Sequence, residues 1–414
     1  MSSLLFFLKK IAKAILPSGL YERLKAYYWK RKPLQISQAE VPTAPPKKFP
    51  YGINLFIYKT NNSAGMEGHL LQSALTAGNI PYQVFDLSAP ERFCSEQKGD
   101  LPYGVNLIVL HAASGTPRRM QMFGIDLAKY YNIGYWAWEL DEVPDAYCEG
   151  IEMFQEVWTL SDFCTKALEK KATMPVLTVP NCANPDRDVL PNGREYFRFA
   201  PDPFLFMFAY DCNSFVARKN PQAVVKAFMK AFTPEDTHVG LVLKLIYPEN
   251  FKEHVDELLE MLSPYKNIYY IHRYLSDTEM RTLVQSSDAF ISLHRSEGLG
   301  LLPMEAMALG TPVISTAWSG NMEYMNHMNA ALVDYTMVPV DGQYAGCISG
   351  DGLMWAEADV DVAAQLMRRM VEDKVWRDKL ISHGHHTIEH DYDATTIGTM
   401  MRNRLGILGF VETR

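Results

Sequence analysis

Residues 296–314 read SEGLGLLPMEAMALGTPVI and hold two acids, Glu297 and Glu305, eight positions apart. A glycine-rich loop and Pro303 lie between the two acids. The preceding residues 288–294 (DAFISLH) have the pattern of a buried strand, and another apolar strand pattern closes the stretch. Strand, glycine loop, helix and strand follow one another as in an α/β nucleotide-binding unit.

A helix is expected to follow the glycine loop, because Pro303 fits a first helical turn and Gly310 is a common C-terminal signal. The first backbone N–H groups of a helix lack intrahelical partners and, with the helix dipole, attract an anion such as a diphosphate. Glycines in the loop allow a ligand to approach the backbone closely. The expected donor-binding residues of this segment are Gly298, Leu299, Gly300, Leu301 and Leu302.

The two acids have a functional and a structural interpretation. Glu305 is predicted in the first helical turn, where its carboxylate can accept hydrogen bonds from a ribose diol. Glu297 lies one loop earlier and can hold a sugar hydroxyl. Alternatively, both acids simply favour a helix N-terminus. The surrounding strand, loop and proline favour the functional interpretation.

Length and composition indicate a two-domain protein without a nucleic-acid partner. A chain of 414 residues exceeds what one hydrophobic core usually organises, and 48% hydrophobic residues suffice for two cores. The net charge of −8 argues against general nucleic-acid binding. The six cysteines form no C-x-x-C pair, which is typical of reduced thiols in a cytoplasmic protein.

Residues 1–32 form a basic arm in which eight Lys or Arg residues face one acid, Glu22, giving a local charge of +7. Its apolar run, residues 4–8, is too short for a membrane-spanning helix and lacks a signal-peptide cleavage site. An amphipathic basic stretch with Trp29 fits an anionic membrane surface, whereas the alternative is a disordered or partner-packed tail. A proline-rich linker follows at residues 33–50.

Residues 51–190 are predicted to form a first Rossmann-like domain. Strand patterns at residues 52–58, 82–85 and 106–110 alternate with a helix expected over residues 69–77. The glycines after the first strand do not match G-x-G-x-x-G, so the sequence gives no support for dinucleotide binding.

A later strand pattern, residues 131–139, ends in Trp138 and Glu139. An aromatic ring can stack on the apolar face of a sugar, and a carboxylate can bind its hydroxyls. These two residues are therefore candidates for the sugar-side wall of a cleft. The alternative places the tryptophan in the core and gives Glu139 a capping role.

Residues 191–390 are predicted to form a second Rossmann-like domain. After its first strand, residues 204–210, Arg218 and Lys219 lie where a strand-to-loop turn points at a bound diphosphate. Lys244 is expected to end the next strand and is a third cationic candidate. The alternative for all three cations is a solvated surface position.

Two patterns that suggest a metal are assigned to structural roles. Asp359 and Asp361 match D-x-D, but they precede a predicted helix and are expected to cap it. Four histidines near the C-terminus are expected to pack or to be exposed: His383, His385, His386 and His390. No metal and no other cofactor is expected.

The acidic stretch resembles the E-x7-E signature of retaining glycosyltransferases of the GT-B fold, glycosyltransferase family 4. Other segments resemble a branch of that family that builds bacterial surface polysaccharides: residues 134–140 (GYWAWEL), 156–158 (EVW), 161–163 (SDF), 215–221 (FVARKNP) and 319–323 (SGNME). The resemblance extends from about residue 50 to residue 410.

The resemblance implies two Rossmann-like domains that face a cleft, with residues 391–414 crossing back to the first domain. It places Gly65 near the donor phosphate, with a plain turn as the equal alternative, and His111 as an acceptor contact. Family members commonly carry an arginine five residues before the lysine. Ser214 occupies that position here, so either Arg218 substitutes for this arginine or the spacing differs.

The expected function is transfer of a hexose from a nucleotide-diphosphate sugar to a hydroxyl of a lipid-linked glycan, at the cytoplasmic face of the cell membrane. Retention of the anomeric configuration is implied by the resemblance. Glu297, Lys219 and Arg218 are the expected catalytic residues. One alternative is a sugar-nucleotide epimerase, which would act on the donor alone. Another is a catalytically silent scaffold, against which the intact Glu297, Glu305 and Lys219 argue.

Overall fold

The computed structural model describes residues 44–46, 48–60, 63–88, 99–109, 120, 123–148, 150–340 and 352–410. The basic arm, most of the proline-rich linker and His111 lie outside the described residues. No helix in the described ranges is both long enough and apolar enough to cross a membrane.

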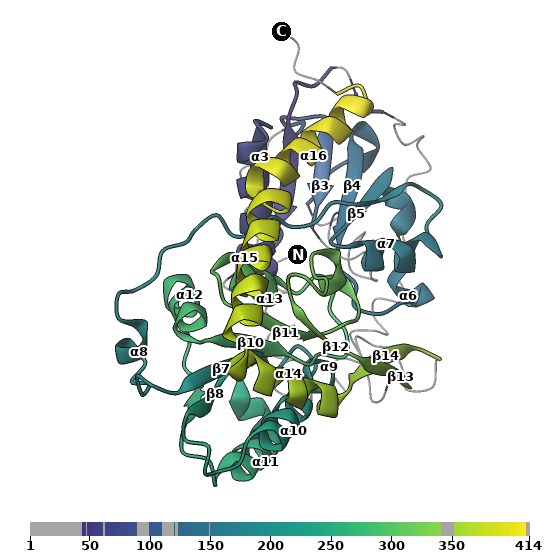
Figure 1. Ribbon diagram of the computed structural model, residues 1–414. Coiled ribbons are helices and arrows are strands. Elements are labelled where there is room, and N and C mark those ends of the chain that lie inside the picture. The colour runs from purple at the N-terminus through teal and green to yellow at the C-terminus, as the bar shows by residue number, and fades with distance from the viewer. Residues whose placement is uncertain are drawn as a thin grey trace, which may run out of the picture. The chain divides into compact units, whose positions relative to one another are not determined.

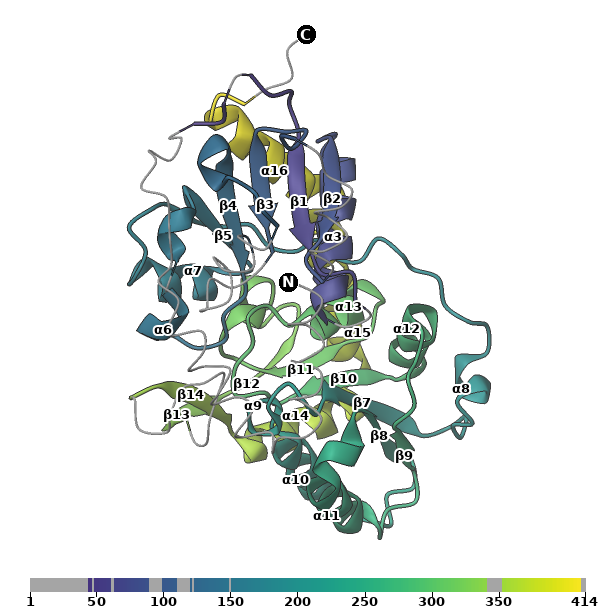
Figure 2. The same cartoon turned by 180° about the vertical axis from the view of Figure 1, so that it is seen from behind.

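The first half of the described chain forms a six-stranded parallel sheet in the order β2-β1-β3-β4-β5-β6. Helices α3 (Ser63–Ala77) and α7 (Asp162–Glu169) connect some of its strands. Figure 2 shows β2, β1, β3 and β4 side by side. The strands are Ile53–Ile57, Tyr82–Asp86, Val105–Ile108, Tyr131–Trp136, Glu156–Thr159 and Val176–Thr178, numbered β1 to β6.

A row of buried amides runs across the first sheet. The side chain of Asn54 in β1 donates to Asn106 in β3 at 2.9 Å, and Asn106 donates to Asn132 in β4 at 2.8 Å. All three asparagines are fully buried. Since an unpaired buried amide is costly, sliding one strand by a residue would be penalised, and the row helps to fix the register.

The second half forms another six-stranded parallel sheet, in the order β12-β11-β10-β7-β8-β9. Counted from its own first strand, this is the 3-2-1-4-5-6 order of a Rossmann fold, with its switch point between β7 and β10. The strands are Phe204–Asp211, Val239–Ile246, Ile268–Ile271, Ala289–Ser292, Val313–Thr316 and Ala331–Val333, numbered β7 to β12. The fold is therefore α/β with two Rossmann-like domains, as expected.

Helices cover the second sheet, and short elements join its parts. The longer helices are α10 (Pro221–Ala231), α11 (Lys252–Leu262), α12 (Asp277–Ser286), α13 (Leu301–Ala308) and α14 (Val360–Glu372). The short ones are α6 (Asp145–Cys148), α8 (Gly193–Tyr196), α9 (Val216–Lys219) and the 3-10 helices η1 (Leu127–Lys129), η2 (Ile151–Met153), η3 (Pro248–Phe251) and η4 (Gly320–Glu323). An antiparallel hairpin consists of β13 (Tyr335–Pro339) and β14 (Met354–Ala358).

The chain ends in helices α15 (Lys374–Asp391) and α16 (Ala394–Ile407), and α16 packs against α3 (Figure 1). Arg404 on α16 donates to the buried carboxylate of Glu156 on β5, with Nη2 2.5 Å from Oε2. The C-terminal segment therefore contacts the first sheet, in line with the crossing that the resemblance implies.

Side chains cap several of the helices, and the cap at Asp359 was predicted. Ser161 caps α7 by accepting from the Cys164 N–H, Ser276 forms a capping box with Glu279 at the start of α12, and Asp359 caps α14. One predicted boundary was wrong. Helix α3 begins at Ser63 instead of His69.

Candidate active site

The candidate site lies at the switch point of the second sheet. Strands β7 and β10 are neighbours there, and the chain leaves their carboxyl ends in opposite directions. Residues after β7 supply Arg218 and Lys219, whereas residues after β10 supply Glu297. Ligands of open α/β sheets bind at such a point, so the topology itself brings the predicted catalytic residues together.

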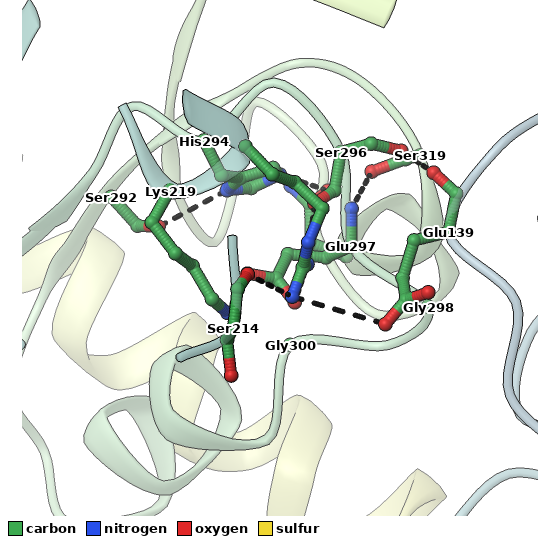
Figure 3. Close-up of polar contacts among 12 residues, drawn as sticks. Glu139, Ser214, Lys219, Ser292, His294, Ser296, Glu297, Gly298, Gly300 and Ser319 are labelled. Carbon is green, nitrogen blue, oxygen red and sulfur yellow. Dashed lines mark hydrogen bonds and ion pairs between the residues drawn. The ribbon is translucent and has the colours of Figure 1, made fainter. Parts of the chain in front are cut away.

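Glu297 accepts hydrogen bonds from both cations (Figure 3). The Lys219 ammonium contacts one carboxylate oxygen, and the Arg218 Nη1 atom lies 3.1 Å from the other. The Arg218 Nη1 also donates to the Ser296 carbonyl at 2.9 Å. All three side chains are at least four-fifths buried. Two cations therefore share the Glu297 carboxylate, and both lie where a bound anion could contact them.

Burial and ion pairing shift the pKa values of Glu297 and Lys219 in opposite directions. Burial raises the pKa of the Glu297 carboxyl, but Lys219, Arg218 and His294 more than reverse that effect, and the pKa of Glu297 lies well below its usual value. Burial also lowers the pKa of the Lys219 ammonium, assisted by Arg218 and opposed by Glu297. Glu297 is thus held as a carboxylate.

The position of Arg218 relative to Ser214 bears on whether Arg218 substitutes for the arginine of the family pattern. Arg218 Nη2 donates to the Ser214 carbonyl at 3.3 Å, so the guanidinium lies beside the residue at which the family pattern has arginine. The turn is unusual, because Phe215 and Asn220 have φ values of +63° and +53°. The structure thus places Arg218 beside Glu297, where it can take the place of the missing arginine.

His294 and Asn321 support the site, although neither side chain was expected to take part in it. The ring of His294 is fully buried, with Nδ1 3.1 Å from Ser292 Oγ and Nε2 3.1 Å from Asn321 Oδ1. Burial lowers the pKa of this ring. The only signal in the sequence was its position three residues before Glu297 at the end of a strand.

Backbone contacts fix the glycine loop between β10 and α13. The Glu297 N–H donates to Ser319 Oγ at 2.8 Å, and the Gly320 N–H donates to the Glu297 carbonyl at 2.8 Å. A Cβ atom on Gly320 would stand 2.0 Å from the Gly298 carbonyl oxygen, so only glycine fits there. The Gly320 N–H is therefore used within the loop.

Helix α13 begins at Leu301, after Gly300 with φ +84°, close to the predicted start. Pro303 still lies in its first turn. The helix ends in a Schellman motif, since the N–H of Thr311 bonds to Ala306 and that of Gly310 bonds to Met307. Leu301 and Leu302 are consequently the first helical residues, and the predicted anion-binding N–H groups stand at the helix start.

Glu305 lies in the second turn of α13, which corrects the prediction of a first-turn position. Burial raises the pKa of its carboxyl, while Arg281, Arg187 and a hydrogen bond from Asn184 oppose the rise. The side chain is only partly buried. Glu305 is therefore on the same helix as the predicted anion site but one turn farther from its start.

Contacts between the two sheets bring Glu139 to the cluster. Glu139 Oε1 lies 3.8 Å from Arg218 Nη2, and the Ser296 hydroxyl donates to the Glu139 carbonyl (Figure 3). Ser161 Oγ donates to the Gly298 carbonyl at 2.6 Å. The segment after β4 and the start of α7 thus touch the glycine loop, and the carboxyl edge of the first sheet faces the candidate site.

Trp138 occupies a core position, which is the alternative that the sequence left open. Its side chain is 7% exposed, its Nε1 donates to the Glu142 carbonyl at 2.8 Å, and its ring packs on Tyr147. It offers little surface for stacking on a sugar. Glu139, by contrast, keeps 29% of its side chain exposed.

Lys244 is separate from the contacts that define the cluster. It lies inside β8, which continues to Ile246, so the prediction that it ends the strand was wrong. Its Nζ donates to the Leu245 carbonyl at 3.1 Å, and burial lowers its pKa to about 8. The charged groups that act on it include Arg273 and Asp211.

Gly65 lies in the first turn of α3, after β1. A Cβ atom there would stand 1.6 Å from the Thr60 carbonyl oxygen, so glycine is required for the helix to pass this backbone. Two residues farther, burial raises the pKa of Glu67 to about 8. A hydrogen bond from Asn181 opposes that rise, and the charge of Glu139 adds to it.

The four histidines of the C-terminal group are exposed, which is one of the two expected outcomes. They lie on α15, where His383 Nδ1 is 3.0 Å from the Met328 carbonyl and His385 Nδ1 is 2.9 Å from the Ala308 carbonyl. Across the described ranges, no three His, Cys, Asp or Glu side chains are grouped as metal ligands would be.

Residues 209–338 match the model of the family described as glycosyl transferases group 1. This segment contains Arg218, Lys219, Glu297 and Glu305. No curated protein matches the chain significantly.

Solved structures share the fold at low identity. HepE from Anabaena, solved with UDP and glucose, has a TM-score of 0.62 at 13% identity, over 86% of this chain and 100% of HepE. Sucrose-phosphate synthase from Thermosynechococcus elongatus has a TM-score of 0.63 at 13% identity, over 87% and 99%. WaaG, a glycosyltransferase involved in lipopolysaccharide biosynthesis, has a TM-score of 0.54 at 13% identity, over 86% and 99%.

The family match covers the segment that carries Arg218, Lys219 and Glu297, and the fold similarity covers most of the chain. At these identities the structural similarity shows the fold, while the family match points to the chemistry. Together they support a GT-B glycosyltransferase.

Proposed function

We propose that the protein is a retaining glycosyltransferase, similar to glycosyltransferase family 4, that moves a hexose from a nucleotide-diphosphate sugar to a hydroxyl of a lipid-linked glycan in polysaccharide biosynthesis. The observation that carries the proposal is the Glu297 carboxylate held between Lys219 and Arg218 at the switch point of the second sheet. Cations placed there can neutralise the charge that develops on a departing diphosphate.

Each group has a role in the proposed reaction. The start of α13 and the two cations bind the diphosphate, Glu305 binds the ribose, and Glu297 holds a hydroxyl of the transferred sugar. The acceptor hydroxyl attacks from the face that the leaving phosphate occupies, and that phosphate takes the hydroxyl proton. The glycosidic bond to the phosphate breaks as the bond to the acceptor forms, so the configuration is retained. Two cations and helix N–H groups can hold the diphosphate without a metal.

UDP-sugars are the first donors to test, because HepE was solved with UDP and with UDP-glucose. Thermal shift with UDP-, GDP- and dTDP-sugars selects the base, since a ligand that binds the native state raises the melting temperature. Calorimetry then compares the wild type with Glu305→Ala. Loss of hydrogen bonds between a carboxylate and the ribose should weaken binding by roughly 1.5–3 kcal/mol.

Glu372→Ala is the control, because Glu372 is an exposed acid at the end of α14. Unchanged nucleotide affinity in a folded Glu305→Ala protein would remove Glu305 from the donor site. Proton NMR of the product with a glycan acceptor reports the anomer, and an inverted anomer would contradict retention.

Two alternatives give different products in the same assay. A sugar-nucleotide epimerase changes the sugar of the donor without any acceptor, which chromatography of donor-only reactions detects. A silent scaffold binds donor weakly or not at all and releases no nucleotide. The shared site of Glu297, Lys219 and Arg218 favours transfer over the scaffold, because such paired charges stabilise a reacting diphosphate.

The proposal includes membrane recruitment through the basic arm at residues 1–32. Each basic residue close to an anionic surface contributes about 1 kcal/mol, and salt weakens the effect. Full-length protein should sediment with anionic vesicles and protein lacking residues 1–32 should not, while donor affinity stays the same. Equal sedimentation of both proteins would assign the arm to a protein partner instead.

A further inference from the structure

The hairpin β13–β14 lies beside the two loops that carry the cluster. Its first strand, Tyr335–Pro339, contains the last residue of the family match, and its second strand, Met354–Ala358, lies beyond that match. Trp355 on β14 is buried, and its ring lies near Phe215 and under the Arg295 guanidinium. The second strand is thus packed against the active-site turn.

Glu357 on β14 holds one residue from each loop. Its Oε2 accepts from Arg295 at 2.6 Å, and its Oε1 accepts from Asn220 at 3.1 Å. Arg295 is two residues before Glu297, and Asn220 directly follows Lys219. One carboxylate therefore joins the two segments that supply the Glu297–Lys219 pair.

Backbone hydrogen bonds reinforce the same junction. The Arg295 N–H donates to the Arg218 carbonyl at 2.7 Å, and the Arg295 Nη1 donates to the Ala217 carbonyl at 2.8 Å. The Ala356 N–H on β14 donates to the Arg295 carbonyl at 3.0 Å. Arg295 thus binds the turn after β7 and the hairpin at once.

We propose that Glu357 is a positioning residue, which sets the separation of Glu297 and Lys219 by anchoring Arg295 and Asn220. The inference rests on the proposed function, because it concerns the geometry of that reaction. Asn220 is the sensitive partner, since its left-handed φ of +53° puts it at the end of the short α9 helix, immediately after Lys219. Its side-chain bond to Glu357 holds this turn in place.

A positioning role and a purely structural role differ in the kinetics. A small misplacement of catalytic groups can lower the rate about 10²-fold. The start of α13 and Glu305, which are proposed to bind the donor, have no bond to Glu357 among the described contacts. Glu357→Ala should therefore lower kcat on the order of 10- to 100-fold. Its KM for the donor should stay within about threefold of the wild type, as expected when ground-state binding is retained.

Glu357→Gln is the conservative variant. Its amide oxygen can accept from Arg295, and its amide nitrogen can donate to a flipped Asn220 side chain. Both anchors then survive, and kcat should recover to within about threefold of the wild type, since such a swap keeps the hydrogen-bond count. Asp378→Ala is the control for loss of an ion pair as such, because Lys374 pairs with Asp378 at 2.6 Å on the exposed face of α15.

Asn220→Gly removes the anchor at the other end without strain, because glycine readily adopts a positive φ. If Glu357 acts through Asn220, the double variant Glu357→Ala with Asn220→Gly should have a kcat no lower than that of the slower single variant. If the reductions in kcat of the two single variants add up in the double variant, Glu357 does not act through Asn220. Equal falls in kcat and in donor affinity, or a kcat for Glu357→Ala within twofold of the wild type, would overturn the proposal.

Hydrogen exchange separates this proposal from the proposed function. In Glu357→Ala, amides of residues 216–220 and 294–298 should exchange faster than in the wild type, while those of Asp378→Ala should not. This readout needs no substrate. A wild type without transferase activity would refute the function and leave the anchoring measurable, whereas unchanged exchange in an active enzyme would refute the anchoring alone.

Discussion

The charge balance at Glu297 depends on residues that are distant in the sequence. Arg218 and Lys219 could be selected from the sequence because they follow a strand in a loop rich in polar residues. Their pairing with Glu297, almost eighty positions away, arises only when β7 and β10 become neighbours. Lys244 was selected on similar grounds, as a cation at the predicted end of a strand. In the structure β8 continues to Ile246 and Lys244 is buried within it, which the strand pattern did not indicate.

The two lysines can be distinguished by replacement with methionine, which keeps the length of the side chain. Lys219→Met should lower turnover by about 10²-fold or more, because a charge that stabilises the leaving diphosphate is lost. Lys244→Met should leave turnover near normal, since Lys244 contacts the Leu245 carbonyl and not Glu297. Steady-state kinetics with the donor selected above decides this. A slow Lys244→Met enzyme beside a normal Lys219→Met enzyme would reverse the assignment.

Glu67 should make stability depend on pH. Burial raises its pKa from 4.5 to about 8, with Glu139 and Asn181 as its neighbours and Tyr135 within electrostatic reach. The folded protein therefore keeps a proton that the unfolded chain releases above pH 4.5, and the free energy of unfolding should fall as the pH rises from about 4.5 to 8, by about 1.4 kcal/mol per pKa unit at most.

Glu67→Gln cannot release this proton, so its stability should vary less over the same pH range. Urea unfolding at several pH values between 5 and 8.5 measures both proteins, with the flanking acids unchanged. Parallel curves for the wild type and Glu67→Gln would show that Glu67 titrates normally.

At the scale of single elements, sequence signals for helix starts are reliable where the interaction involves only neighbouring residues. Ser161, Ser276 and Asp359 cap their helices because a side-chain oxygen next to the first turn needs no distant partner. The start of α3 was missed because Gly65 and Gly68 resemble helix breakers. Both are instead required by packing, since a Cβ on Gly65 would meet Thr60 and one on Gly68 would meet Ile57 on β1.

Helix α16 shows the same effect where it crosses α3. A Cβ atom on Gly398 would stand 2.1 Å from the Ala74 carbonyl oxygen and 2.6 Å from the Gly78 nitrogen. Gly398→Ala should push the helices apart and lower the free energy of unfolding by about 1–3 kcal/mol, as overpacking does. The control is Met400→Ala, because Met400 is exposed on the same helix. Chemical denaturation of both variants tests the crossing, and equal stabilities would show that α16 adjusts freely.

At the scale of the whole molecule, two Rossmann-like halves could be predicted from alternating strand and helix patterns, and the structure confirms them. The sequence could not show which groups join the halves. Ser161 to Gly298 and Ser296 to Glu139 are contacts between polar residues that no local pattern pairs. They follow from the tertiary arrangement, in which the carboxyl edges of both sheets meet.

The contact of α16 with the first sheet depends on an ion pair that the sequence did not reveal. Glu156 is fully buried, and besides Arg404 it accepts hydrogen bonds from Trp158 at 2.7 Å and Tyr131 at 3.2 Å. Arg404 is its only described cationic partner. A carboxylate so deep in the sheet is tolerated because these three donors replace the water that it loses.

Arg404→Ala should therefore destabilise the protein by about 3–5 kcal/mol, because it leaves a buried carboxylate without its counter-charge. Arg402→Ala, at an exposed position of the same helix, should change stability by less than about 0.5 kcal/mol. In the double variant Arg404→Met with Glu156→Gln, the buried charge is gone. The free energy of unfolding of this variant should therefore fall less than that of Arg404→Ala. Urea unfolding of the four proteins measures this. If the double variant is the least stable of them, the charge of Glu156 is not what ties α16 to the first sheet, and its packing on α3 must hold the helix instead.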